Sequence, residues 1–535
     1  MFVYLCKQHA SNMSTILSKT LSAESPTACV AHGFKRLELG GPFWQAFSKF
    51  RDGGHAFLLD SSLTTSKHSQ YSFIGSQPTA VFQAHRIHPR SLPFESVIEI
   101  HRFASLCGEK YAGAQIEHLQ GDALEPLRDL LAEYAAPFKE EARRRFPFLG
   151  GAVGFFGYEA GSWSGPGGSI KSPTETNIPD IYFAIYDRVL CHDNASGETY
   201  ISVVGRGDTN ESAIASGDRA IREIRQKIGE TCIVTNRDAD HSTSSAEKIQ
   251  DDSTESSRDS QQRCFDKDRY CEAVRTIGEH IEAGDIYQAC MTQRFQSDFT
   301  KRDPWILYGA LRTGNPAPFA CYLQTPTFNV VSASPERYLS VDRSGWAESR
   351  PIKGTRPRGI NPHQDAALRQ ALIDSEKDRA ENVMIVDLVR NDFGRVCRFG
   401  SIDVSQLMQI ETYATVFQMV STVRGELSKD RDRLDLVRAT FPGGSMTGAP
   451  KIEAMKILDR LEPVRRGIYS GGIGYLDYAG AMDLNMVIRS LIIENGVLSY
   501  HAGGGVVADS SPEAEYQESL DKVVALQTAL EKSQN

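Results

Sequence analysis

Residues 351–359 of this 535-residue chain read Pro-Ile-Lys-Gly-Thr-Arg-Pro-Arg-Gly. Proline fixes the backbone φ angle and glycine permits close backbone approach, so Lys353 is presented by an unusually constrained segment. An ammonium group held in this way can pair with an anionic substrate, lose its proton on desolvation and act as a nucleophile, or extend into water. The residues around this segment are needed to choose among the three.

A helix is expected over about residues 374–390, and it places an acidic side chain against apolar neighbours. Glu381 has Met384 and Ile385 one turn further along, so its carboxylate lies beside an apolar stripe. A buried carboxylate requires a cation, a metal ion or hydrogen bonds. The spacing leaves open a simple ion pair with Lys377, one turn back.

Two glycine-rich segments of the C-terminal part suit an anionic or small ligand. Residues 441–451 read Phe-Pro-Gly-Gly-Ser-Met-Thr-Gly-Ala-Pro-Lys and begin a helix that ends near Leu461. Lys451 follows Ala-Pro and precedes no Ser or Thr, which excludes a phosphate-binding loop, although free N–H groups at a helix start suit a carboxylate. A plain turn with a helix cap is the alternative. Residues 502–507, Ala-Gly-Gly-Gly-Val-Val, leave backbone amides uncovered for a small ligand.

The sequence pattern alone leaves open the roles of two charged residues near these segments. Arg489 ends an apolar strand; most such arginines form structural ion pairs, but a planar guanidinium beside exposed amides also suits a carboxylate substrate. The final helix begins at Ser511, an N-cap followed by proline, and its apolar stripe leaves Glu518 on the solvated side. Periodicity by itself assigns Glu518 no function.

The chain divides at a segment almost without apolar residues. Residues 236–263 are rich in Ser, Asp and Gln and cannot bury enough surface to order themselves, so a flexible linker or insertion is expected. Before them, residues 31–235 contain repeated apolar strands and a helix over 210–229, whereas residues 264–535 carry the segments described above. Residues 1–30 are expected to form a frayed extension, because they show no clear amphipathic period.

Composition excludes several classes of protein. The formal net charge of -9 argues against nucleic-acid binding, for which a basic surface is usual. The ten cysteines form no Cys-x-x-Cys pair and have no zinc-like spacing with histidine, which predicts reduced thiols in a cytoplasmic protein. No apolar run approaches the ~20 residues that cross a bilayer, so no membrane association is expected.

Several motifs that occur in one order resemble the chorismate-utilising enzyme family. They are dense from Phe265 to about Leu530, and a looser similarity extends through the N-terminal half. The motifs are Ser334-Pro335-Glu336 and residues 351–359, 378–382, 386–392, 441–451, 471–475 and 503–518. The resemblance implies an α/β (α+β) fold in which both halves join one unit of two large antiparallel β-sheets, packed as a sandwich with helices outside.

The residue at position 353 separates members of this family. Anthranilate synthases and isochorismate synthases usually have alanine there, whereas lysine is typical of members that aminate chorismate at C4 for p-aminobenzoate and folate biosynthesis. Gln288 stands where the isochorismate and salicylate enzymes carry a lysine that activates water, and an amide cannot be that base. The resemblance therefore implies amination at C4 through a covalent Lys353 intermediate, with an anthranilate synthase component as the alternative.

The resemblance also implies roles for individual residues. Lys353 is the implied nucleophile, and Glu336 the general acid that assists departure of the C4 hydroxyl. Glu381 and Glu518 are the implied ligands of Mg²⁺, which overrides the solvated interpretation of Glu518. The residues implied to contact substrate are Arg489, Tyr475, Gly504, Gly505, Lys451 and Ser445.

Two features of the implied mechanism need local support. Lys353 must be uncharged to attack, so burial and nearby cations, with Arg356 and Arg358 as candidates, are expected to favour the neutral amine. Gln418 occupies a position where many relatives have histidine, so any help that this imidazole gives to the leaving group is absent here or comes from another residue.

The same resemblance implies a protein partner and a further small-molecule ligand. No cysteine lies in a glutaminase-type turn, so ammonia is expected from a separate glutamine amidotransferase subunit. Residues 58–61 resemble a segment that lines a tryptophan pocket in relatives, which makes bound tryptophan a further expectation. A catalytically silent subunit that senses chorismate or tryptophan is the alternative from another class, and the retention of Glu336, Lys353, Glu381 and Glu518 argues against it.

Overall fold

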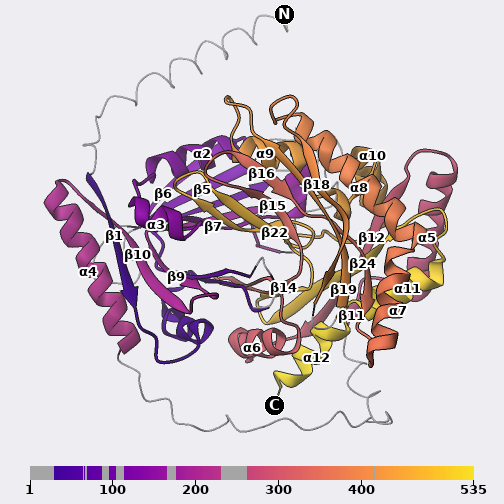
Figure 1. The fold of residues 1–535 in the computed structure, drawn as a ribbon, viewed down its shortest axis with the longest axis horizontal. Coiled ribbons are helices and arrows are strands. Elements are labelled where there is room, and N and C mark those ends of the chain that lie inside the picture. The colour runs from indigo at the N-terminus through magenta and orange to yellow at the C-terminus, as the bar shows by residue number, and fades with distance from the viewer. Residues whose placement is uncertain are drawn as a thin grey trace, which may run out of the picture.

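The described residues form two sheets of 12 strands each, with helices packed against them (Figure 1). The computed structural model describes residues 29–63, 66, 69–86, 96–103, 114–164, 176–229, 262–413 and 416–534. Residues 1–28 of the expected extension and 236–261 of the expected linker lie outside these ranges. The two sheets and their outer helices confirm the fold class that was expected from the sequence.

The first sheet runs through strands from both parts of the chain. In spatial order its strands are β1 (Cys29–Leu37), β10 (Glu198–Gly207), β9 (Arg188–Asp193), β3 (Tyr71–Ser76), β2 (Ala56–Asp60), β13 (Phe319–Gln324), β14 (Phe328–Ser334), β23 (Ser490–Glu494), β24 (Val497–Val506), β12 (Gln288–Asp298) and β11 (Gln262–Arg263), with β20 (Gly448–Ala449) paired to β12. The junction between the two parts is the antiparallel pair β2–β13, where Leu59 is opposite Cys321.

The second sheet is assembled in the same mixed way. Its strands are β17 (Ile352–Pro357), β19 (Val416–Glu426), β16 (Trp346–Ser349), β15 (Arg337–Val341), β22 (Met482–Met486), β21 (Gly472–Asp477), β7 (Gly151–Phe156), β8 (Ile181–Tyr186), β4 (Ala80–Arg86), β5 (Ser96–Arg102) and β6 (Gln115–Gly121), with β18 (Asp403–Thr412) paired to β19. Here β21 joins β7, with Ile473 opposite Phe155. Neither sheet is therefore complete without both parts of the chain.

The alternation of side chains along β2 shows how the layers pack. Phe57 belongs to the large core between the sheets, together with Phe155 and Phe183 of the second sheet. Its neighbour Leu58 points to the opposite face and packs in a separate core with Leu526 of a C-terminal helix. Successive strand residues face opposite sides of a sheet, so one apolar run supplies both cores.

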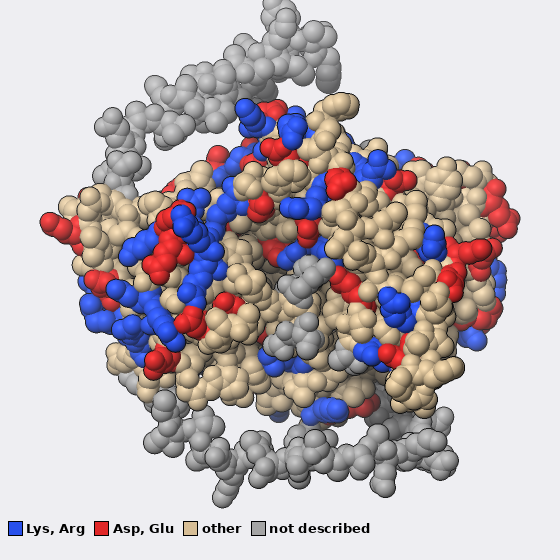
Figure 2. Space-filling view, viewed as in Figure 1, with Lys and Arg blue, Asp and Glu red and all other residues tan. Residues whose placement is uncertain are grey.

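Helices cover the outer faces of the two sheets, and several also lie at one end of the molecule, beside β12, β19 and β24 (Figure 1). They are α2 (Leu124–Glu133), α3 (Glu140–Arg145), α4 (Asn210–Gly229), α5 (Lys267–Glu282), α6 (Pro304–Gly314), α7 (Pro362–Ile373), α8 (Glu376–Gly394), α9 (Arg433–Thr440), α10 (Lys451–Leu461), α11 (Pro512–Asp521) and α12 (Val524–Lys532). In the described part of the chain, no helix combines the length and apolarity required to cross a membrane. On the face shown in Figure 2, acidic and basic side chains are interspersed.

Two local expectations were wrong. The final helix is divided into α11 and α12 near Lys522, because the backbone hydrogen bonds of the first helix end there. Arg489 does not end a strand; it lies in the connection between β22 and β23 with a φ of 50°, a left-handed conformation that non-glycine residues rarely adopt.

Candidate active site

A cavity of about 560 Å³ collects most of the residues implied by the sequence. Strand β17 supplies Lys353, helix α8 supplies Glu381, and helix α11 supplies Glu518. The lining also includes Glu336, Ser445, Arg489, Gly504 and Gly505, which come from separate strands and connections. All but two of the implied site residues therefore line one cavity.

Lys353 is held by a carboxylate rather than surrounded by cations. Its Nζ lies 3.3 Å from Oε2 of Glu381, whereas Lys377 lies 4.0 Å from the other carboxylate oxygen. The expected helpers Arg356 and Arg358 are paired with Asp378 and Asp365 at 2.8 and 2.7 Å. Each arginine is thus paired with a carboxylate of its own, which reduces its effect on Lys353.

Glu336 is a buried carboxyl group whose pKa is raised. Burial raises its pKa to about 7, while Lys353, a hydrogen bond from Ser445 and the backbone N–H of Ile352 partly oppose the rise. The Ser445 Oγ donates to Oε1 of Glu336 at 3.3 Å. A carboxyl group that remains partly protonated near neutral pH can deliver a proton to a leaving group.

Arg489 and the glycines of β24 line the cavity together. The guanidinium of Arg489 faces the cavity without an ion pair to any described residue, and burial lowers its pKa. The structural ion pair considered from the sequence is therefore not formed. A Cβ atom on Gly504 would lie 2.5 Å from the Glu515 carboxylate, and one on Gly505 would lie 2.8 Å from Gln288, so a larger residue at either position would displace these side chains.

Gln288 lies close to Gly505. Its residue is fully buried, and neither atom of its carboxamide has a hydrogen-bond partner among the described residues. A Cβ atom placed on Gly505 would lie within 3.3 Å of both this amide and the Lys353 Nζ. The position where the resemblance implied a water-activating lysine in other members therefore presents a neutral amide close to Lys353.

The carboxylates at the α8–α11 side fit a magnesium ion. Glu381 and Glu518 both line the cavity, and Glu515, whose significance was missed from the sequence, lies behind Gly504 with its Oε2 buried and unpaired. Burial raises the pKa of Glu515. Burial also acts to raise the pKa of Glu518, but the combined effect of Lys522, Lys377 and Lys353 lowers it. The described residues contain no cluster of three or more His, Cys, Asp or Glu suited to a metal ion. Mg²⁺ nevertheless fits, because it binds through one or two carboxylates and retains several waters.

Lys451 does not reach the cavity. Its Nζ donates to Asp392 Oδ2 at 2.6 Å and to the carbonyl oxygen of Thr440 at 2.5 Å, and its side chain is 8% exposed. This buried ion pair joins α8 to α10. The implied contact of Lys451 with substrate is corrected, because its charge is used within the protein.

Tyr475 also lies outside this cavity, and a different tyrosine, Tyr469, lines it. Tyr475 lies in β21 and lines a different cavity, whereas Tyr469 lines the cavity of Lys353 and stacks on His501 at 5.1 Å. The positive φ of 65° at Ser470 turns the chain between Tyr469 and the next strand. No periodic pattern in the sequence signals that turn.

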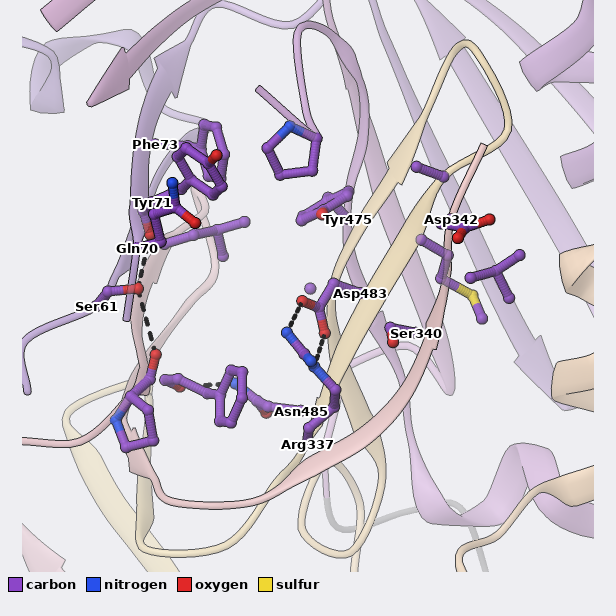
Figure 3. A pocket seen from close by; sticks show the side chains of 18 of the residues that line it. Ser61, Gln70, Tyr71, Phe73, Arg337, Ser340, Asp342, Tyr475, Asp483 and Asn485 are labelled. Carbon is purple, nitrogen blue, oxygen red and sulfur yellow. Dashed lines mark hydrogen bonds and ion pairs between the residues drawn. The ribbon is translucent and has the colours of Figure 1, made fainter. Parts of the chain in front are cut away.

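The second cavity, of about 650 Å³, contains Tyr475 together with residues 59–61 (Figure 3). Tyr71, Phe73 and Tyr475 give it an aromatic lining. Arg337 donates to both carboxylate oxygens of Asp483 at 3.0 and 2.8 Å, as the dashed lines in Figure 3 show. The segment compared with a tryptophan pocket thus lines a cavity that is aromatic on one side and charged on the other.

Comparison with known proteins defines the class to which this fold and cavity belong. The family model described as chorismate binding enzyme matches residues 100–528. The chain belongs to this family of chorismate-binding enzymes.

Two curated relatives and one solved structure show how similar the chain is to individual proteins. The chain is 38% identical to an aminodeoxychorismate synthase of Streptomyces griseus, over 90% of this chain and 61% of the relative. It is 38% identical to component 1 of the aminodeoxychorismate synthase of Bacillus subtilis, over 74% of this chain and 80% of the relative. The crystal structure of anthranilate synthase component I from Streptococcus pneumoniae superposes with a TM-score of 0.68 at 27% identity, covering 86% of this chain and 93% of that chain.

The relatives differ from this chain in length. The chain spans 61%, 51% and 51% of three curated aminodeoxychorismate synthases, from two Streptomyces species and Arabidopsis thaliana. Membership of the family is therefore shown, and the activity of the complete relatives is carried over only as a proposal.

Proposed function

We propose that this chain aminates chorismate at C4 to form 4-amino-4-deoxychorismate, acting in the cytoplasm. The observation that carries the proposal is the placement of Lys353 and Glu336 in one cavity, where a nucleophile and a proton donor can act on the same molecule. The curated names of relatives at 38% identity support the same reaction. The unpaired guanidinium of Arg489 supports an anionic substrate.

Chorismate would be bound by two groups of residues on different sides of the cavity. Arg489 and the backbone N–H groups at Gly504 and Gly505 suit one carboxylate of chorismate. Glu381 and Glu518 would hold Mg²⁺, which supplies a positive charge that anchors the ring carboxylate. These contacts orient the ring so that Lys353 faces C2.

The bonds then change in two stages. The neutral Lys353 amine forms a bond to C2, the ring double bond shifts, and the bond between C4 and its oxygen breaks. Glu336 donates its proton to this oxygen, which leaves as water. Ammonia then forms a bond to C4, the double bond returns, and the bond between C2 and Lys353 breaks. The new ammonium group gives a proton back to Glu336, so the enzyme ends as it began.

Ammonia is proposed to come from a glutamine amidotransferase partner. The relative from Bacillus subtilis is named a component 1, which supports a second component. Purified chain should be active with ammonium alone and with glutamine only after an amidotransferase is added. Activity with glutamine in the absence of any partner would contradict this assignment.

Product analysis tests the reaction itself. Chorismate, Mg²⁺ and ammonium should yield 4-amino-4-deoxychorismate by mass, and a lyase that forms p-aminobenzoate should consume it. Lys353→Ala should lower the rate by at least ~100-fold, because the covalent stage is lost. Formation of anthranilate by the unmodified chain would instead establish the alternative, an anthranilate synthase component, and an undiminished rate in Lys353→Ala would remove the covalent stage.

The second cavity favours a further ligand, and we propose that it binds tryptophan. Its aromatic side chains suit an indole ring, and its charged groups suit an amino acid. Calorimetry should detect tryptophan binding that Tyr475→Ala weakens by about tenfold, since one aromatic contact is removed. Unchanged affinity in this variant would place the ligand elsewhere.

A further inference from the structure

One carboxamide in the active-site cavity has no hydrogen-bond partner among the described residues. Gln418 lies in β19, lines the cavity that holds Lys353 and Glu336, and is 3% exposed. Its Oε1 atom is buried and unpaired. A buried amide without a partner costs free energy, so such a group in a ligand cavity indicates a partner that arrives with the ligand.

Strand pairing places this amide close to the reacting groups. Gln418 is opposite Thr355 in β17, two residues after Lys353 on the same strand. The backbone N–H of Ile352, at the start of β17, contacts the Glu336 carboxyl group. The next residue after Thr355, Arg356, has a side chain that is 33% exposed. In strand register, Gln418 therefore lies between Ile352, which contacts Glu336, and the half-exposed Arg356.

The proposed reaction calls for a group with these properties at C4. A departing hydroxyl oxygen needs a hydrogen-bond donor, and an incoming ammonia molecule needs an acceptor for one of its N–H groups. A carboxamide presents both on one plane and carries no charge at any pH at which the protein is folded. Cations at this place would repel ammonium, and the charges of Arg356 and Arg358 are paired with carboxylates.

From these observations we infer that Gln418 is the ammonia-binding residue of the cavity. Its carbonyl oxygen accepts a hydrogen bond from ammonia, and its NH₂ group donates to the departing hydroxyl oxygen. No bond of Gln418 itself changes: the proton for the leaving oxygen comes from Glu336, and the bond to nitrogen forms at C4 as described above. The inference rests on the proposed amination and names the site of its second substrate.

The test is steady-state kinetics with chorismate, Mg²⁺ and ammonium, without an amidotransferase. Gln418→Met keeps the length of the side chain and removes both hydrogen-bonding atoms. We expect the KM for ammonium to rise by about tenfold or more, with the KM for chorismate within about twofold of its original value. The melting temperature should be unchanged or higher, because the replaced amide makes no bond within the protein.

A second variant and a matched control make the result specific. Gln418→Asn keeps the amide but shortens its reach, and it should also raise the KM for ammonium. Gln324→Met removes another carboxamide whose Oε1 is buried and unpaired but which lies in β13 outside the cavity, and it should leave both KM values unchanged. An unchanged KM for ammonium in both Gln418 variants, or an equal rise in both KM values, would overturn the inference.

The two proposals fail in different ways. If the unmodified chain makes no 4-amino product, the proposed function is wrong. If it makes that product and both Gln418 variants retain its KM for ammonium, only the role of Gln418 is wrong.

Discussion

At the scale of single residues, the proposed chemistry depends on a carboxyl group that is partly protonated near neutral pH. Burial of Glu336 raises its pKa to about 7, against the opposing effects of Lys353 and Ser445. The same residue in water would be ionised at that pH and could not assist a leaving group. The cavity thus changes which form of the side chain is available for the reaction.

This environment predicts a pH dependence. A general acid acts in its protonated form, so kcat should fall as pH rises through about 7, measured at a constant concentration of free ammonia. Ser445→Ala removes a hydrogen bond that lowers the pKa of Glu336, so the fall should move to higher pH. Glu336→Gln should reduce kcat by roughly 10²–10⁴-fold at all pH values. A pH profile that Ser445→Ala leaves in place would assign the fall to another group.

A second prediction tests whether the charge of Lys451 stabilises the fold or contacts the substrate. Lys451 and Asp392 form a buried pair at 2.6 Å, so Lys451→Met should leave the carboxylate without its partner and lower the free energy of unfolding by about 3–5 kcal/mol. Chemical denaturation measures this loss. Lys456→Met, in the same helix but with a 38% exposed side chain, is the control and should change stability little. A stable Lys451→Met protein with a raised KM for chorismate would restore the substrate contact first expected.

At the scale of elements, strand β17 positions Lys353 through an irregular pairing with β19. The register shifts between Ile352 and Thr355, and Gly354 between them has a φ of 79°. A Cβ atom there would lie 2.8 Å from the Asp378 carboxyl carbon and from Leu372. The irregularity therefore needs glycine both for its backbone conformation and for the close approach of α7 and α8.

Gly354→Ala should consequently disturb the site from within the strand. We expect a loss of about 1–3 kcal/mol in stability and a fall in kcat of at least ~10-fold, because Lys353 is displaced along with the strand. Gly345→Ala is a matched control: Gly345 also has a positive φ, of 88°, but its added Cβ would meet no atom within 4 Å. That variant should lose stability without losing kcat, and equal losses of kcat in both would contradict the positioning role.

At the scale of the whole molecule, the two parts of the chain complete each other's sheets. β2 pairs with β13 in one sheet, and β7 pairs with β21 in the other. The core between the sheets likewise mixes residues of both parts, such as Phe183 and Leu484. We therefore expect the two parts of the chain to fold together as one cooperative unit.

Cutting the chain between residues 236 and 261 tests this. The two pieces, expressed together, should remain associated and unfold in one transition, because each exposes unpaired strand edges and apolar core when alone. Size-exclusion chromatography and calorimetry give the result. A C-terminal piece that is folded and monomeric by itself would show that the sheets do not depend on each other.

The sequence by itself determined the local elements and the chemical groups. The 20-residue helix α4 was expected at its observed bounds, since regular periodicity and length are local properties. The order of motifs along the chain placed Lys353, Glu336 and Glu381 within one family pattern.

Only the tertiary structure decided which groups meet. Tyr475 and Lys451 stand in motifs with true cavity residues, yet one faces a second cavity and the other pairs with Asp392. Tyr469 and Glu515 carry no local signal, and they reach the site through a turn at Ser470 and through packing of α11 beneath β24. The physical reason is that side-chain type is written along the chain, whereas direction and partner depend on strand pairing and burial between residues far apart in sequence.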